Sequence, residues 1–200
     1  LGVKLNEATD ATILMPDLRG HGETPLVKKS TFGGAETEDA LAALEFLKSL
    51  KSTNNTQLIG KEIGIYGVEL GALVSLSTAS KDTDVKAVVI DSIPKDSDDM
   101  IASIIDRKYP FASSLTAKIA QFGTYFYFYN GNYNRETSCD FAKMVSDRKV
   151  LVLAGNDNTL LQNSTSTVAE CFSNPANVQK KLNLMPSGYN IINASYTNCS

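Results

Sequence analysis

The sequence predicts one α/β domain with a mostly parallel sheet and flanking helices. Short apolar runs of strand length alternate with longer segments in which apolar residues recur at helical spacing. Strands that alternate with helices form right-handed crossover units, and such units build parallel sheets. A chain of 200 residues fits one domain, so we assign residues 1–200 to it.

The first half of the chain supplies strand, helix, strand and helix in turn, over Thr12–Pro16, Glu36–Leu50, Glu62–Tyr66 and Leu70–Ser80. The first strand is the apolar run T-I-L-M-P, which a Gly-rich turn follows. In the first helix, Ala40, Leu44 and Leu47 fall on one face. We therefore expect two strands that are each followed by a helix.

The second half supplies the strands Val85–Ile90, Lys149–Leu153 and Gln179–Met185 and the helix Gln162–Phe172. The runs V-K-A-V-V-I and K-V-L-V-L have the length and composition of buried strands. Between them, residues 94–147 form an insertion with helical patches and the aromatic run Tyr125–Tyr129. This run predicts packing of the insertion onto the sheet, and lining of a pocket under a lid is the alternative.

The charge balance excludes several classes of partner. Lys and Arg number 19 against 22 Asp and Glu, a net charge of −3, which argues against a nucleic-acid groove. No apolar run approaches the roughly 18 residues that span a bilayer, and no signal peptide opens the chain. We expect a small-molecule ligand, no nucleic acid and no cofactor, and leave the compartment and the oligomeric state open.

Cysteine and histidine limit the available chemistry. The three cysteines, Cys139, Cys171 and Cys199, form no C-x-x-C pair, so we expect free thiols and no zinc site. The four N-x-S/T sequons, at Asn54, Asn163, Asn193 and Asn198, are attributed to chance in a chain rich in Asn, Ser and Thr. His21 is the single histidine of the chain, which restricts any hydrolytic triad to one candidate base.

Functional residues of parallel sheets gather where the strands end. D-L-R-G-H-G (17–22) follows the first predicted strand, and G-V-E-L-G (67–71) joins the next strand to its helix. A-G-N-D-N (154–158) and P-S-G-Y-N (186–190) come later. In order and context these segments resemble the α/β-hydrolase superfamily, in its serine peptidase and esterase branch. The resemblance implies that fold and a nucleophile elbow at Gly67–Gly71.

The resemblance also implies a substituted catalytic triad. Glu69 stands at the nucleophile position, Asn158 at the acid position with Asp157 before it, and Tyr189 at the base position. A tyrosine, with a pKa near 10, cannot act as the base at neutral pH. We therefore predict a catalytically degenerate protein that binds a ligand or partner. The expected binding residues are Gly67, Val68, Leu70, Gly71 and His21, and Asp91 is an alternative acid.

Two further functions stay open. Dehalogenases and epoxide hydrolases of this fold carry Asp at the elbow, and by analogy Glu69 would attack esters, amides or related bonds as a carboxylate nucleophile. The second possible function is cation binding, in which Asp17, Glu69, Asp91 and Asp157 would share a hard cation at the sheet edge. Otherwise each acid has a local role, and Glu69 would accept the first N–H groups of its own helix.

The resemblance implies further strands before the D-L-R-G-H-G strand, one of which would lie at the centre of the sheet. Its loop would supply one N–H group of the oxyanion hole. Only residues 1–11 precede Thr12, so we expect a fold that is incomplete at the N-terminus and a fragment of a longer protein.

Overall fold

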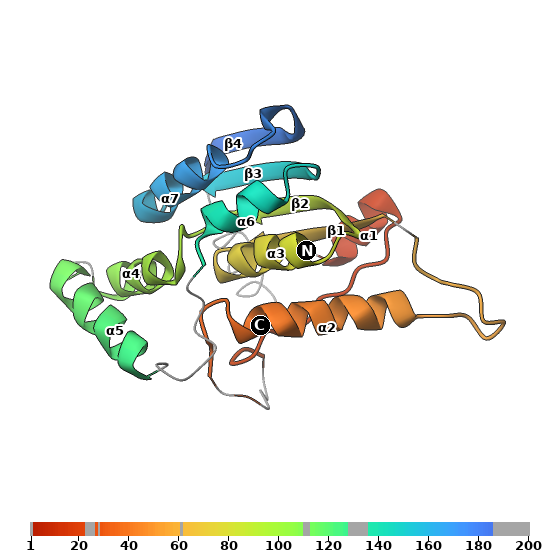
Figure 1. The fold of residues 1–200 in the computed structure, drawn as a ribbon, viewed down its shortest axis with the longest axis horizontal. Coiled ribbons are helices and arrows are strands. Elements are labelled where there is room, and N and C mark those ends of the chain that lie inside the picture. The colour runs from red at the N-terminus through yellow and green to blue at the C-terminus, as the bar shows by residue number, and fades with distance from the viewer. Residues whose placement is uncertain are drawn as a thin grey trace.

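The computed structural model describes residues 2–22, 27, 29–60, 62–109, 113–127 and 136–185. Its helices are α1 (Gly2–Thr9), α2 (Ala35–Ser49), α3 (Leu70–Lys81), α4 (Ser97–Lys108), α5 (Ser113–Tyr127), α6 (Ser138–Met144) and α7 (Thr159–Ala169), with a 3-10 turn at Pro175–Asn177. Its strands are β1 (Ile63–Val68), β2 (Val85–Asp91), β3 (Lys149–Gly155) and β4 (Val178–Leu184) (Figure 1). The order of elements confirms the predicted α/β class.

The four strands form one parallel sheet in the order β1-β2-β3-β4. All the strands therefore end at the same edge of the sheet, with Val68 of β1 beside Asp91 of β2 and Asp91 beside Leu153 of β3. The alignment brings the segments that follow the strands close together.

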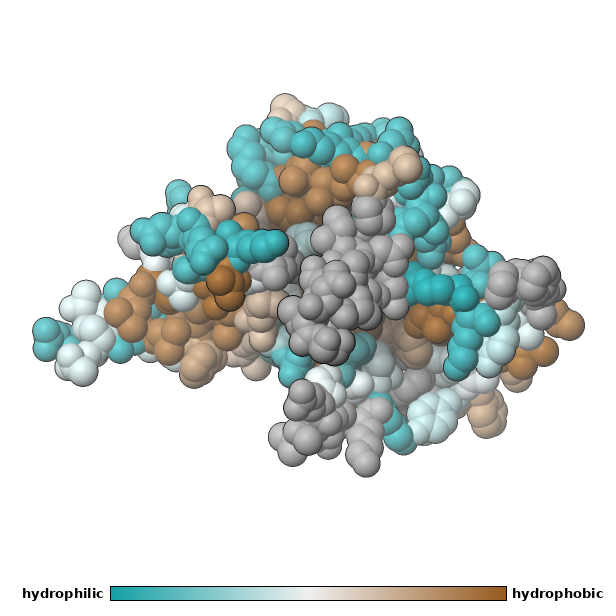
Figure 2. Space-filling model, turned by 180° about the vertical axis from the view of Figure 1, so that it is seen from behind, coloured by the Kyte–Doolittle hydropathy of each residue, from teal (hydrophilic) through white to brown (hydrophobic). Residues whose placement is uncertain are grey.

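The core fills one face of this sheet. Leu73 and Leu76 of α3, Phe141 of α6 and Val168 of α7 pack against a row of strand residues that includes Val88. Helices α3, α6 and α7 lie on this face, in front of the strands (Figure 1). On the other face of the sheet, the strand residues Ala87, Val89, Leu151 and Leu153 are half-buried. Figure 2 shows apolar atoms gathered over β2 and β3 on this face.

Within the insertion, α6 packs on the core, whereas α4 and α5 project beyond the end of the sheet where the strands finish, with α5 packed on α4 (Figure 1). Tyr125, Phe126 and Tyr127 stay exposed on α5, so the prediction that the aromatic run packs onto the sheet is wrong for these three residues. The remaining two, Phe128 and Tyr129, lie outside the described residues. Among the described helices, none is long and apolar enough to cross a membrane.

The predicted strand Thr12–Pro16 is not a strand in the structure. The segment has no regular secondary structure, and Leu14 and Met15 are exposed. A strand needs a hydrogen-bonded neighbour, and no described residue pairs with this segment. Other differences are shifts of boundary by a few residues: α7 covers Thr159–Ala169 and not Gln162–Phe172, and β1 extends to Val68.

The prediction of free thiols is wrong for two of the three cysteines. Cys139 at the start of α6 and Cys171 after α7 form a disulfide, with their Cα atoms 5.2 Å apart. The pairing joins α6 to the segment after α7 through two cysteines that are 32 residues apart in sequence, and spacing alone does not reveal such a contact. Cys199 lies outside the described residues.

Candidate functional site

The turn from β1 into α3 is sharp because its first glycine has no side chain. A Cβ on Gly67 would collide with the backbone carbonyl of Gly71 and meet Ser75 Oγ at 2.5 Å. Gly71, in contrast, has open space where its Cβ would be, so of these two glycines only Gly67 avoids a clash. Between them, Glu69 has a φ of 51°, a left-handed conformation that costs a non-glycine residue about 1–3 kcal/mol.

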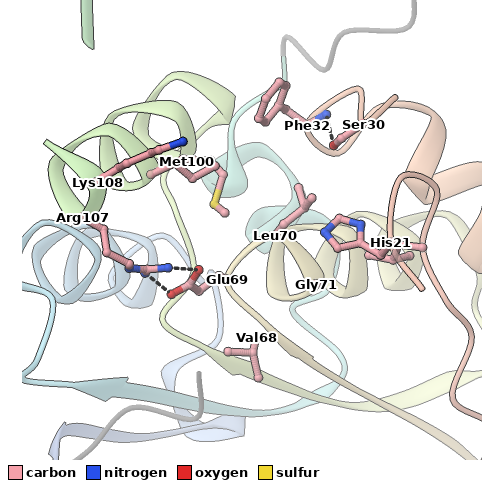
Figure 3. A pocket seen from close by; sticks show the side chains of 12 residues that line it. His21, Ser30, Phe32, Val68, Glu69, Leu70, Gly71, Met100, Arg107 and Lys108 are labelled. Atoms are coloured by element: carbon pink, nitrogen blue, oxygen red, sulfur yellow. Dashed lines mark hydrogen bonds and ion pairs between the residues drawn. The ribbon is translucent and has the colours of Figure 1, made fainter. Parts of the chain in front are cut away.

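Glu69 forms an ion pair with Arg107 of α4. Arg107 Nη2 donates to Glu69 Oε1 at 2.5 Å, and Nη1 donates to Oε2 at 3.5 Å (Figure 3). The Glu69 side chain is 8% exposed and that of Arg107 is 35% exposed. Glu69 makes no side-chain hydrogen bond to the N-terminus of α3, so the expectation that it accepts those N–H groups is wrong.

The surroundings of Glu69 disfavour its charged form. Burial raises the pKa of Glu69, and the negative charges of Asp157 and Asp91 raise it further. The hydrogen bond and the positive charge of Arg107 oppose this rise without cancelling it. The carboxyl group therefore depends on Arg107 for its ionised form.

Glu69 and Arg107 lie at the wall of a cavity of about 630 Å³. The apolar lining residues are Leu18, Phe32, Val68, Leu70, Met100 and Ile104. Polar groups come from His21, Ser30, Arg107 and Lys108, beside Glu69 and Gly71 (Figure 3). The volume and the mixed lining are typical of a small-molecule site.

A buried carboxylate fixes one wall of this cavity. Glu36 at the start of α2 is fully buried, and it accepts hydrogen bonds from Ser30 Oγ, from the N–H and hydroxyl of Thr31 and from Gly33 N–H. Burial alone would raise the pKa of Glu36, but the hydrogen bonds from Thr31 and Ser30 hold it below the usual range. Phe32, within this loop, has a φ of 54°, and its carbonyl accepts from Ser97 Oγ at 2.7 Å.

The predicted binding residues Val68, Leu70, Gly71 and His21 line one cavity with Glu69. Gly67, near the end of β1, does not line the cavity. His21 Nδ1 lies 3.1 Å from the carbonyl oxygen of Arg19, and its ring lies beside Leu70, whereas the Glu69 side chain points toward Arg107 (Figure 3). Tyr189 lies outside the described residues.

The two positions predicted to hold the acid have different surroundings. Asn158 is the N-cap of α7: its Oδ1 accepts from Leu161 N–H, and its Nδ2 donates to Ser103 Oγ at 3.1 Å. The exposed Asp157 acts on Glu69 through its charge.

The four acids expected at the sheet edge do not form a cation site. Within the described residues, no group of three or more His, Cys, Asp and Glu side chains could hold a metal ion. Asp91 accepts a hydrogen bond from the hydroxyl of Ser92, and the carboxylate of Asp17 faces Gly22 in its own turn. The local roles expected as the alternative describe these two acids better.

Helix α4 contributes four lining residues that were not predicted from the sequence. Met100, Ile104, Arg107 and Lys108 of this helix line the cavity, and their spacing of four, seven and eight residues from Met100 places them on one helix face. The spacing could have identified a shared face within the insertion. It could not show that this face meets Glu69, because their contact joins residues 38 apart in sequence.

The parallel sheet, its flanking helices and the sharp strand-to-helix turn give this chain an α/β-hydrolase-like fold, over the part of that fold that it covers. Among solved structures, the esterase Pf2001 of Pyrococcus furiosus is similar, with a TM-score of 0.56 and 22% sequence identity. The match covers 82% of this chain and 58% of that esterase, so the chain spans less than two thirds of its length.

Two further solved structures give weaker matches. NosK from Streptomyces actuosus has a TM-score of 0.48 at 17% identity, over 83% of this chain and 72% of NosK. The esterase RhEst1 from a Rhodococcus species has a TM-score of 0.46 at 16% identity, over 82% of this chain and 69% of the esterase. No family model matches the sequence, and no curated protein matches it closely enough to count as a relative.

Proposed function

We propose that this protein binds a small-molecule ligand in the cavity beside Glu69 and does not hydrolyse it. The observation that carries the proposal is the ion pair between Glu69 and Arg107. A carboxylate nucleophile needs a lone pair aimed at the substrate. Both oxygens of Glu69 accept from the guanidinium of Arg107, and this cation stabilises the negative charge that the carboxylate would use in the attack, which lowers its nucleophilicity.

The position of the single histidine supports the same conclusion. Hydrolysis through a covalent intermediate needs a base that activates water or a hydroxyl group. His21 is exposed and bonds the carbonyl oxygen of Arg19, and its ring lies on the Leu70 side of the cavity, away from Arg107 (Figure 3). Neither Asp157 nor Asn158 lines the cavity. The cavity itself, with its largely apolar wall, supports the binding of a small-molecule ligand without hydrolysis.

The test compares the wild-type protein with Glu69→Gln in the hydrolysis of p-nitrophenyl acetate and p-nitrophenyl butyrate. Lys86→Gln is the matched control, since the Lys86 ammonium binds the Thr83 carbonyl on an exposed turn outside the cavity. We expect all three proteins to hydrolyse the esters at the same background rate. The proposal would be overturned if the wild-type protein hydrolysed the esters faster than this background rate and Glu69→Gln abolished that activity.

Mass spectrometry tests the alternative of a carboxylate nucleophile directly. Attack of Glu69 on styrene oxide would open the epoxide and form a hydroxyalkyl ester, which adds the mass of the epoxide to the protein. We expect no adduct on the peptide that contains Glu69. An adduct on this peptide in the wild-type protein that is absent from Glu69→Gln would favour a hydrolase with Glu69 as its nucleophile.

A further inference from the structure

The cavity has an apolar part and a cationic part. Phe32, Leu70 and Met100 belong to, or pack against, a small core cluster and form much of the apolar wall. Arg107 and Lys108 contribute the positive charges from the last turn of α4. A ligand with an apolar body and one polar end would match this division.

The charges of the lining do not cancel. Glu69 and Arg107 neutralise each other, which leaves the positive charge of Lys108 at the cavity. Within the described part of the chain, no carboxylate forms an ion pair with Lys108, whose ammonium lies 5.7 Å from the centre of the Tyr109 ring. A ring contact of this kind leaves the net charge in place.

The start of α3 adds to this preference. Leu70 and Gly71 are the first two residues of the helix, and both line the cavity. The first N–H groups of a helix have no partner within it, and the helix dipole places partial positive charge there. Lys108 and the start of α3 therefore both favour negative charge in the cavity, although the whole protein has a net charge of −3.

We propose that the cavity binds an amphiphilic monoanion, whose apolar chain contacts Phe32, Leu70 and Met100 and whose acid group pairs with Lys108. The proposal rests on the ligand-binding function above and adds the chemical class of the ligand. Lys108 is then a specificity-determining residue, which selects acids over neutral molecules of the same shape.

Matched probes separate the charge from the apolar chain. Sodium octanoate, 1-octanol and octylammonium chloride share a chain length and differ in their head group. Each is titrated into the full chain, labelled with ¹⁵N, and the dissociation constant is taken from the amide shifts of Val68, Leu70 and Gly71. The titrations are repeated with Lys108→Gln, with Lys108→Arg and with the Lys86→Gln control.

We expect octanoate to bind more tightly than 1-octanol, and octylammonium to bind most weakly. Lys108→Gln should weaken octanoate by up to about fivefold, the effect of one partly exposed charge pair, and leave 1-octanol unchanged. Lys108→Arg and Lys86→Gln should preserve the preference. Raising the salt concentration should reduce the preference for octanoate, because Lys108 is exposed.

The outcomes distinguish the two proposals. Three results would overturn the anion proposal and leave the proposal of ligand binding intact. Octanoate and 1-octanol could bind equally, octylammonium could bind more tightly than octanoate, or the preference for octanoate could survive in Lys108→Gln. A failure of all three probes to shift any cavity amide would count against both proposals. If Lys108 only stabilises the last turn of α4, Lys108→Gln would change the melting temperature and not the selectivity, which also overturns the anion proposal.

Discussion

Arg107 of α4 holds the carboxylate of Glu69 at 2.5 Å, so the residue at the tip of the strand-to-helix turn is bound to the insertion. The contact joins two elements that both line the cavity. It also lowers the pKa of Glu69, against burial and two neighbouring acids that raise it. We therefore expect the stability of this turn to depend on Arg107.

Removing Arg107 should destabilise the protein in a pH-dependent way. In Arg107→Gln, Glu69 loses its cation, and its already raised pKa rises further. An acid with a raised pKa lowers the stability above its unfolded-state pKa and has no such effect below it. We expect a loss of about 1–2 kcal/mol at pH 7.5, modest because Arg107 is 35% exposed, and a smaller loss at pH 4. Urea unfolding at both pH values measures this.

Two variants control for other effects of that substitution. The double variant Arg107→Gln with Glu69→Gln should regain stability at pH 7.5, since no buried charge is left unpaired. Lys108→Gln removes a neighbouring charge that makes no described ion pair, and its effect should not vary with pH in this range. An equal loss for Arg107→Gln at both pH values would contradict the assigned role of Glu69.

The two glycines of the turn should respond differently to the same substitution. Gly67→Ala forces a Cβ into the Gly71 carbonyl, so we expect a loss of about 3 kcal/mol or more in the free energy of unfolding. Gly71→Ala places its Cβ in open space within α3, where alanine is the better helix former by about 1 kcal/mol. Its stability should be unchanged or higher. Thermal melting of both variants checks the pair, and similar losses would refute the packing of the turn.

Glu36 should be important for stability and for the cavity wall. Glu36→Gln replaces a carboxylate with an amide whose NH₂ group faces hydrogen-bond donors, so we expect a loss of about 2–4 kcal/mol at pH 7. The lowered pKa of Glu36 means that the wild-type protein has this stability above the ordinary glutamate pKa and loses it as the pH falls through the lowered value.

The control for this variant is Glu38→Gln on the same helix, where Glu38 pairs with Lys81 on the exposed surface. Its loss should stay below about 0.5 kcal/mol. Urea unfolding at pH 7 and pH 3 should show that the difference between wild type and Glu36→Gln shrinks in acid. A difference that is the same at both pH values would show that the carboxylate charge is not the stabilising feature.

The disulfide between Cys139 and Cys171 should stabilise the helices α6 and α7. Closing a loop over a separation of 32 residues stabilises a protein by about 3–4 kcal/mol in the chain-entropy model. Reduction should therefore lower the melting temperature of the wild-type protein and leave that of Cys139→Ser unchanged. Peptide mapping under non-reducing conditions should recover the two cysteines in one linked peptide. Separate peptides from the unreduced folded protein would refute the pairing.

Much of the fold could be predicted because its elements carry local signals. The strands β2 and β3 are short apolar runs, and the G-V-E-L-G segment lies in the sharp turn between β1 and α3. The segment Thr12–Pro16 carries the same apolar signal but has no strand among the described residues. Its sequence shows a preference for the extended form, and a strand also requires a neighbour to pair with.

The site could be predicted only in part. Val68, Leu70, Gly71 and His21 line the cavity with Glu69 because strand ends and their loops meet at one edge of a parallel sheet. Arg107, Lys108 and Phe32 could not be assigned to the site from the sequence, because their contacts depend on how the insertion and the loop before α2 fold back.

The sequence by itself determined the order of the four strands of the sheet and of the helices α2, α3 and α7, the glycine that the turn requires and the absence of a second histidine. These properties are local or compositional, so a linear chain displays them. Only the tertiary structure decided that Glu69 pairs with Arg107, that Cys139 meets Cys171 and that Glu36 is buried beneath Thr31 and Gly33. Each of these depends on which segments pack together, and that choice minimises the free energy of the whole chain rather than of any one segment.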